Sequence, residues 1–485
     1  MSTSNAGLTR SPVAGRHWLC ALVVALSAAA CSSDENTAPV PDVASDTTAD
    51  STNLEPDAAD GSAADSADDT DTSGPPPQFE AANSVPEGDP LYVGQQLFLN
   101  ETFGTGVLSS MPPADFLVQL METEPEVFGN QFENFGFIAD PGNEFPIGLR
   151  RDPLFPDEYK ETCALCHVAT LPDGRVWIGA PNESLQLSAF NLAVEERWMA
   201  AGNSALFTEA EREKLRQLGP GRTSAESGSY PRLVPANYPP YWDIGLRNDL
   251  NYMGTGQNMR TEVYFSLFSA GCGDPNDEEA IVPWPAEELL APFIEYMSSL
   301  RPPEAPAQDA EAVARGQQVF EEANCTTCHI VDDPEAEFVV PLDFSEGGRE
   351  RYAGEEEGWP RGSLRTSRVH RFLADGDPDF PDSTDERVGI LVSFIISKGL
   401  TVRQTDGYRT NTLRGLWATA PFLHNGSVPT LEDLLKPASE RPVTFMQGEH
   451  QVDTRLFGFS NEGHEFGVDL SAEEKADLLV YLRSL

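Results

Sequence analysis

Two pentapeptides in this sequence have the pattern Cys-x-x-Cys-His. The first occupies positions 163–167 and the second positions 325–329. In this pattern the two thiols form thioethers with the vinyl groups of a porphyrin, and the histidine that follows binds the iron. The spacing therefore predicts two covalently bound c-type haems. The residues that hold them are Cys163, Cys166, His167, Cys325, Cys328 and His329.

Other uses of paired cysteines account for these motifs less well. A zinc site made of two Cys-x-x-Cys pairs needs them roughly 15–20 residues apart, whereas the pairs at 163–166 and 325–328 are far more distant. A thioredoxin-like redox pair explains one motif but neither histidine. After the N-terminal 31 residues the only cysteine outside the motifs is Cys272, so no disulfide framework can form. We expect Cys272 to be a buried or half-buried free thiol.

The remaining histidines predict that the two irons differ. A haem with both axial positions filled by protein transfers electrons, whereas a haem with an open position reacts with small molecules. Every spare histidine of the folded part lies in the C-terminal half, so we expect the far side of the haem on His167 to be open or to hold water. Three methionines, Met199, Met253 and Met259, could fill that side, but methionines in such surroundings are more often core residues, which is the role expected of them. The candidates for the sixth ligand of the second haem are His464, Met446, His424, His450 and His370.

The N-terminal part of the chain predicts export and a tether. Residues 1–31 have a basic start, a short apolar run and small residues before Cys31. This resembles a bacterial lipoprotein signal in which that cysteine carries the lipid; the alternative is an ordinary cleaved signal. Residues 32–88 are rich in Asp, Ala, Ser, Thr and Pro and predict a disordered acidic linker.

These segments and the net charge predict the location and partners of the protein. It is expected in the periplasm, on the outer membrane or at the cell surface, with membrane contact through the N-terminal lipid only. A formal net charge of −46 over 485 residues excludes a nucleic-acid binder that relies on phosphate neutralisation.

The folded part is predicted to contain one arrangement twice. A Gly-x-x-x-Phe pattern at 94–98 and at 316–320 resembles the opening helix of a cytochrome c domain. Apolar residues at helical spacing predict closing helices near 289–300 and 478–485. Each half therefore has an opening helix, a haem motif and a closing helix.

Local signals refine these helices. Ser471 and Glu474 form a capping box at the start of the last helix. Pro292 is expected to kink the first closing helix or to delay its start. The phenylalanines of an insertion at 102–162 are expected mainly to pack a core, and the alternative is an apolar channel.

The run at 413–431 reads Leu-Arg-Gly-Leu-Trp-Ala-Thr-Ala-Pro-Phe-Leu-His-Asn-Gly-Ser-Val-Pro-Thr-Leu. It resembles the signature of the bacterial di-haem cytochrome c peroxidase superfamily, closest to the branch with the di-haem rubber oxygenases of Gram-negative bacteria. The segment 461–467, Asn-Glu-Gly-His-Glu-Phe-Gly, also resembles that branch. The resemblance implies that the first haem meets hydrogen peroxide or dioxygen, while a six-coordinate second haem supplies electrons taken from a small redox protein. It also implies a calcium ion between the domains.

The resemblance assigns roles to further residues. His464 would be the second axial ligand of the second haem, with Met446 as the runner-up. His424 would order the loop between the haems, and Trp417 of the same run would lie against the cofactor. The aromatic bridge between the haems would be Trp242 or Tyr252. The residues over the first haem would be Glu262, Phe265 and Phe268. A glutamate there favours peroxidase chemistry, whereas an apolar lid favours oxygenation, so both stay open.

The sequence thus predicts a mainly α fold with two cytochrome c-type haem domains in tandem, at 89–305 and 306–485, behind a disordered tether. The expected function is a peroxidase-like oxidoreductase that uses electrons from the C-terminal haem at the N-terminal haem. One alternative is a dioxygenase that cleaves an apolar alkene or polyisoprenoid. The other is an electron-transfer cytochrome without a substrate.

Overall fold

The folded region includes residues that the sequence assigns to the linker. The computed structural model describes residues 79–102, 112–152, 156–223, 235–247, 250, 252, 256, 258–260, 263, 287–331, 333, 339–341 and 407–485. The predicted signal lies outside them. The predicted end of the linker at residue 88 is wrong, because Asn83 exchanges hydrogen bonds with the backbone of Ile178 at 2.8 and 2.9 Å. The amide of Ala82 also donates to the Val176 carbonyl at 2.8 Å.

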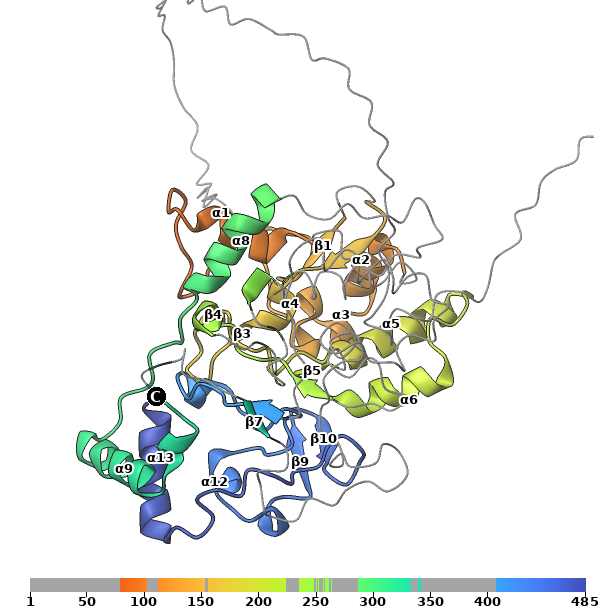
Figure 1. Cartoon of the computed structure of the whole chain (residues 1–485). Coiled ribbons are helices and arrows are strands. Elements are labelled where there is room, and N and C mark those ends of the chain that lie inside the picture. The colour runs from red at the N-terminus through yellow and green to blue at the C-terminus, as the bar shows by residue number, and fades with distance from the viewer. Residues whose placement is uncertain are drawn as a thin grey trace, which may run out of the picture. The chain divides into compact units, whose positions relative to one another are not determined.

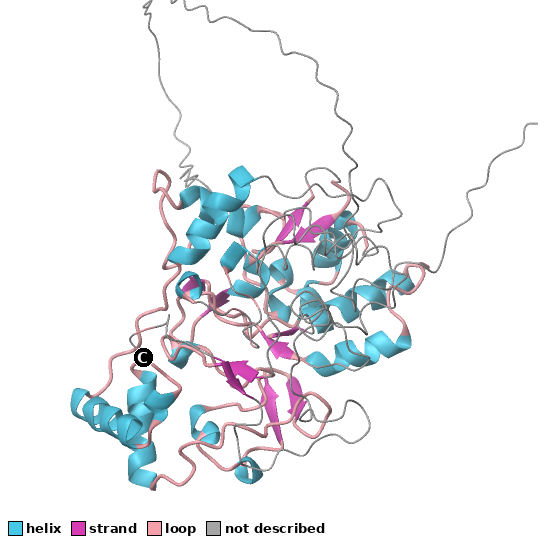
Figure 2. Ribbon diagram, in the orientation of Figure 1, coloured by secondary structure: helices cyan, strands magenta, loops and turns pink. Residues whose placement is uncertain are grey.

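Helices make up most of the regular structure in these residues (Figures 1 and 2). The α-helices are α1 Tyr92–Asn100, α2 Ala114–Thr123, α3 Pro125–Phe128, α4 Ala164–His167, α5 Leu187–Ala200, α6 Glu209–Leu218, α8 Glu287–Ser299, α9 Ala310–Glu322, α12 Leu431–Leu434 and α13 Ala472–Arg483. The 3-10 helices are η1 Asn130–Phe135, η3 Ile244–Leu246, η4 Cys325–Thr327, η6 Leu416–Ala418 and η7 Ala438–Glu440.

The strands described are short and pair in antiparallel twos, β1 with β2, β3 with β4, β5 with β6, β7 with β8 and β9 with β10. Their bounds are β1 Leu149–Arg151, β2 Tyr159–Glu161, β3 Val168–Thr170, β4 Val176–Ile178, β5 Arg222–Thr223, β6 Ala236–Asn237, β7 Val339–Pro341, β8 Gly407–Arg409, β9 Thr444–Gln447 and β10 His450–Asp453.

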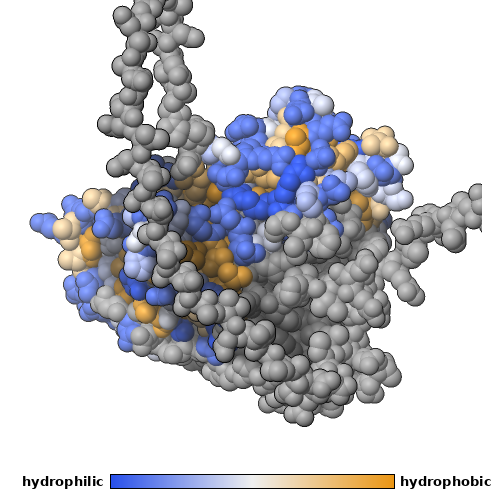
Figure 3. All heavy atoms as spheres, turned by 90° about the horizontal axis from the view of Figure 1, so that it is seen from above, coloured by the Kyte–Doolittle hydropathy of each residue, from blue (hydrophilic) through white to orange (hydrophobic). Residues whose placement is uncertain are grey.

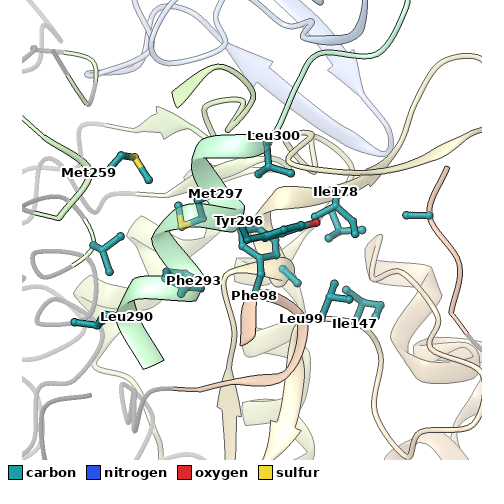
Figure 4. Close-up of a cluster of buried hydrophobic side chains, with 14 of the residues drawn as sticks. Phe98, Leu99, Ile147, Ile178, Met259, Leu290, Phe293, Tyr296, Met297 and Leu300 are labelled. Carbon is teal, nitrogen blue, oxygen red and sulfur yellow. The ribbon is translucent and has the colours of Figure 1, made fainter. Parts of the chain in front are cut away.

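The first closing helix, α8, packs across the first opening helix, α1 (Figure 1). Gly94 lies at the crossing, where a Cβ atom would overlap the backbone oxygen of Pro292. Phe98 is fully buried and meets the Tyr296 ring edge-on, at a centroid distance of 5.9 Å. Figure 4 shows both rings inside the apolar cluster that α8 covers. Because α8 begins before Pro292, the predicted late start is wrong.

The second helix pair repeats these contacts. Gly316 of α9 lies against α13, where a Cβ atom would overlap the backbone oxygen of Asp477. Phe320 is buried and meets the Tyr481 ring at a centroid distance of 5.4 Å. The Ser471 capping box is present at the start of α13. The same glycine crossing and the same pair of aromatic rings occur in both halves, whereas the duplication of a whole haem domain stays a prediction.

We expect Gly316→Ala to destabilise the protein by about 2 kcal/mol, because overpacking costs typically about 1–3 kcal/mol and a backbone oxygen cannot rotate away. Helix propensity alone predicts the opposite sign, a gain of about 1 kcal/mol. The free energy of unfolding in urea decides between them. The control is Arg315→Ala, which removes an exposed ion pair with Asp477 from the same helix and should leave the free energy of unfolding close to that of the wild type. A variant as stable as the wild type would contradict the crossing.

The phenylalanine-rich insertion forms a packed core rather than an open lining. Phe128 and Phe132 are fully buried, and the ring of Phe190 from α5 lies 4.8 Å from that of Phe132. Phe137 lies 5.0 Å from Phe190 in an edge-on contact. The expected packing role is therefore confirmed for these rings.

The described residues of both halves belong to one compact unit. The predicted division at residues 305 and 306 stays a prediction. Among the helices of the described residues, none combines the length and the apolar character needed to cross a bilayer. In the view from above, hydrophilic residues cover much of the described surface, with apolar areas between them (Figure 3).

Candidate haem sites and the contact between them

The first haem motif lies on and before α4, between β2 and β3. The Nδ1 atom of His167 lies 3.1 Å from the carbonyl oxygen of Pro239. A carbonyl only accepts hydrogen bonds, so Nδ1 carries the ring proton and Nε2 keeps its lone pair for a metal. Burial lowers the pKa of His167 to about 3, so the imidazole is neutral at physiological pH. Neutral imidazole is the form that binds iron.

The second motif has the same arrangement. It begins in η4, and the Nδ1 atom of His329 lies 3.1 Å from the carbonyl oxygen of Asn411. The tautomer is therefore the same as in His167, with Nε2 unprotonated. The cysteines of both motifs are half-buried free thiols. Two thiols beside a histidine with a free Nε2 are the donor set that covalent haem requires, so the residues at both motifs fit the cofactor.

A second imidazole faces His329. The ring centroids of His329 and His464 are 6.4 Å apart. Two imidazoles that bind one metal from opposite sides, each at about 2 Å, have ring centroids about 6 Å apart. The side chain of His464 is half-buried overall, and its Nδ1 atom is buried without a hydrogen-bond partner. Burial, and then the neighbouring His329, lower the pKa of His464 to about 4.

The loop around His464 is fixed by an arginine that the sequence does not single out. Arg441 is buried, and its guanidinium donates to the carbonyl oxygens of Asn461, Gly463 and His464 at 2.5, 2.8 and 3.1 Å. His464 has a left-handed backbone, with φ of 49°. The runner-up ligand Met446 is 58% exposed on β9. The geometry thus favours His464 over Met446 as the partner of His329.

Trp242 lies between the two halves of the chain. It is fully buried, and its indole Nε1 donates to the carbonyl oxygen of Arg414 at 2.9 Å. The backbone of Gly415, with φ of 75°, lies on its ring, because a Cβ atom there would be 2.8 Å from the ring carbons. On the other side, the neighbouring Tyr241 stacks on His167 with ring centroids 3.5 Å apart. Of the two predicted bridges, Trp242 thus contacts the C-terminal half directly and is next in sequence to the ring that stacks on His167.

Tyr252, the other predicted bridge, lies beside His424. The hydroxyl of Tyr252 donates to the carbonyl oxygen of Asn237 at 3.3 Å, and its ring is 6.4 Å from that of His424. His424 stacks on Tyr408 at 5.1 Å. Its own carbonyl accepts from the Asn237 amide at 2.7 Å. These contacts agree with the loop-ordering role predicted for His424.

Arg222 holds the next residues of the same loop. It is 2% exposed, and it donates to the carbonyl oxygens of Asn425 and Gly426, both at 2.8 Å. Its third bond, at 2.9 Å, goes to Pro220. Trp417 packs against the buried cluster that contains Trp242, and its indole nitrogen is buried without a hydrogen-bond partner. The signature run is thus held from the N-terminal half by residues far away in the sequence.

Glu161 adds an acid beside the first motif that the sequence does not predict. It ends β2, two residues before Cys163. Burial raises the pKa of its carboxyl to about 7. A group with this pKa is about half protonated at neutral pH and is suited to move protons.

The residues predicted to lie over the first haem are outside the described residues, as are several others. They are Glu262, Phe265, Phe268, Met253, Cys272 and His370. Met259 is 8% exposed and packs in the α8 cluster, as expected of a core residue (Figure 4). Met199 is 37% exposed on α5, so the core expectation is wrong for it. Within the described ranges, no group of three or more His, Cys, Asp or Glu side chains is arranged to hold a metal ion, calcium included.

His450, one of the candidate ligands of the second haem, is half-buried on β10. Its ring lies against Gly219, where a Cβ atom would meet the imidazole. Burial, and then the Arg222 cation, lower the pKa of His450 below its ordinary value of 6.5.

We expect His450→Gln to make the protein less sensitive to mild acid. Below about pH 6.5 the unfolded chain protonates this histidine while the folded protein does not, so stability falls as the pH drops through this range. The difference between the urea midpoints at about pH 7.5 and about pH 5.5 should therefore be smaller in the variant. Gln451→Asn, at an exposed position of the same strand, is the control. An unchanged difference would refute the coupling.

Comparison with known proteins agrees with this site. The site has the donor set of a c-type cytochrome, and two imidazoles lie close together in the C-terminal half. Residues 407–446 match the family model described as RoxA-like, cytochrome c-like. The match includes the run at 413–431 and confirms the resemblance predicted from it. A cytochrome c-like family implies covalently bound haem, while the number of haems stays a prediction.

Two curated relatives come from Sinorhizobium fredii. The chain is 41% identical over 105 residues to the uncharacterized protein y4iJ. This alignment covers 16% of this chain and 18% of y4iJ. The chain is also 30% identical over 184 residues to the uncharacterized protein y4iM. This alignment covers 36% of this chain and 39% of y4iM. The chain thus matches well under half of the length of either relative. A crystal structure of a MauG-like protein associated with microbial copper homeostasis aligns at 21% identity and a TM-score of 0.31, over 56% of this chain and 79% of that one.

Proposed function

We propose that this protein is a di-haem c-type cytochrome with peroxidase-like activity. Electrons enter at the second motif and are used at the first, on hydrogen peroxide or dioxygen. The observation that carries the proposal is the difference between the two histidines, since His329 faces the imidazole of His464 whereas tyrosine rings lie beside His167. Iron held on both sides passes electrons, and iron with an open side reacts. The RoxA-like match supports the haem oxidoreductase class.

The residues at each motif have defined tasks in this proposal. When bound, each haem supplies an iron that exchanges one electron at a time. The cysteine pairs would hold the porphyrins, and the Nε2 atoms of His167, His329 and His464 would bind the irons. The carbonyls of Pro239 and Asn411 keep the ring proton on Nδ1 and fix the orientation of each imidazole.

The contact between the halves completes the arrangement. Reduction of one hydrogen peroxide to two waters consumes two electrons and two protons. Trp242 excludes water from the contact and provides a buried aromatic ring between the two sides. Glu161, with a pKa raised by burial to about 7, can give and take back a proton near the first motif.

The setting of the reaction is also part of the proposal. The segment at 1–31 and the acidic stretch that follows it support an exported lipoprotein whose catalytic part is tethered at a distance from the membrane. The electron donor is then a small redox protein of the same compartment.

A second candidate is a dioxygenase that cleaves an apolar alkene or polyisoprenoid. The observation in its favour is the RoxA-like description of the matching family model, together with the rubber oxygenase branch that the run at 413–431 resembles. In this case dioxygen is consumed and both of its atoms enter the product.

Electron paramagnetic resonance of the purified protein tests the proposal first. We expect one low-spin iron with two imidazole ligands and one iron that is high-spin or binds cyanide. Two low-spin irons that ignore cyanide, peroxide and dioxygen in both redox states would leave only electron transfer. Peroxide-dependent oxidation of a reduced cytochrome identifies the peroxidase, and dioxygen uptake with polyisoprene identifies the oxygenase.

A further inference from the structure

Arg414 contacts two successive residues of the N-terminal half, Trp242 through its backbone and Asp243 through its side chain. The carbonyl of Arg414 accepts the indole N–H at 2.9 Å. Its guanidinium pairs at 2.9 Å with the carboxylate of Asp243, the residue directly after Trp242. The backbone and the side chain of one residue of the C-terminal half therefore hold two successive residues of the N-terminal half.

The carboxylate of Asp243 has an unusual environment. It is fully buried and has a left-handed backbone, with φ of 58° and ψ of 8°. A second cation, Arg301, lies at 4.0 Å and is half exposed. A buried carboxylate is tolerated when it is paired, and removing one partner of such a pair is strongly destabilising. The close charge pair with Arg414 therefore stabilises the Asp243 carboxylate in its buried position, directly after the residue that carries the indole.

Further contacts restrict the orientation of the Trp242 indole. The flat surface of Gly415 lies on one part of its ring, and the Arg247 guanidinium donates to the Trp242 carbonyl at 3.1 Å. Gly415 directly follows Arg414, so the contact on the ring depends on where Arg414 is held. The amide of Asp243 donates to the Leu300 carbonyl at 3.0 Å and ties the same turn to the end of α8.

We propose that Arg414 is a positioning residue that sets the orientation of Trp242 between the two haem sites. The inference deepens the proposed function and rests on it, because it gives the C-terminal half control over the aromatic contact through which the two sites communicate. The Arg414 side chain is about one-third exposed, so its guanidinium lies at the edge of the contact between the halves. Its partner Asp243 is not exposed to solvent.

The test measures the rate at which one electron moves from one iron to the other in the haem-loaded full chain after flash reduction, with both midpoint potentials measured. We expect Arg414→Gln and Asp243→Asn to slow this transfer several-fold at unchanged potentials. Arg414→Lys, which keeps the charge, should recover most of the rate. Arg455→Gln, which breaks an exposed local ion pair with Asp453, should leave it unchanged.

A double-mutant cycle separates positioning from general damage. In a Trp242→Phe background, Arg414→Gln should add no further slowing, because both changes act on one contact. The near-ultraviolet circular dichroism change caused by Arg414→Gln should likewise disappear in that background. An equal slowing in both backgrounds, or no slowing in either, would overturn the inference. A wild-type protein that exchanges electrons between its haems but ignores peroxide and dioxygen would instead refute the proposed function.

Discussion

Replacing His167 with alanine is expected to abolish turnover while leaving the second haem intact. The Pro239 carbonyl holds the proton of this imidazole on Nδ1, and burial keeps the ring neutral, so Nε2 is the atom available to the first iron. Alanine removes that ligand from the site where the oxidant is expected to react. Initial rates of peroxide-dependent oxidation of a reduced cytochrome should fall to the background, and the spectrum of the second haem should be unchanged.

A smaller replacement distinguishes a lost ligand from a lost fold. In His167→Gly, added imidazole can occupy the vacated space, so part of the activity should return with millimolar imidazole. His450→Gln, in which the histidine removed lies against Gly219 in the C-terminal half, should retain full activity under the same conditions. Full turnover in His167→Ala would place the reaction at the other haem.

His464→Ala is expected to remove the low-spin signal of the second haem. His464 lies 6.4 Å from His329, ring centre to ring centre, which is the spacing of two imidazoles on one metal. Without it the iron loses one axial ligand and should become high-spin or bind an external ligand. Electron paramagnetic resonance should show this change, and reduction by a donor protein should slow.

Met446→Leu is the matched control for this ligand. Met446 is the other candidate that the sequence offers, but its side chain is 58% exposed on β9. The leucine variant should keep the wild-type signal of the second haem. If the signal instead follows Met446 and ignores His464, the methionine is the ligand and the imidazole pair has another role.

Local patterns in the sequence predict the repeated framework well. The spacing of Gly94 to Phe98 and of Gly316 to Phe320 marks both opening helices, because the small residue and the ring must meet the closing helix on one face. The Ser471 capping box is also local and is present. His464 is predicted as an iron ligand from the short segment 461–467, which resembles the rubber oxygenase branch of the superfamily.

Contacts between distant segments could not be predicted in the same way. Arg222 and Arg441 act on backbone carbonyls, and a carbonyl has no residue identity that a pattern can reveal. The stacking of Tyr241 on His167 depends on a turn that brings positions far apart in the chain together. The end of the linker was misplaced because Asn83 finds its partner, Ile178, only in the folded protein.

The helix crossings bear on how the chain acquires its cofactor. Cys325 and Cys328 follow α9 closely, whereas α13, the helix that α9 needs, is made from the last part of the sequence. If the protein is exported N-terminus first, as proposed, the second thiol pair emerges before α13, and the apolar face of α9 is then still unpaired. Under that proposal, haem attachment at these thiols can precede the packing of α13 on α9.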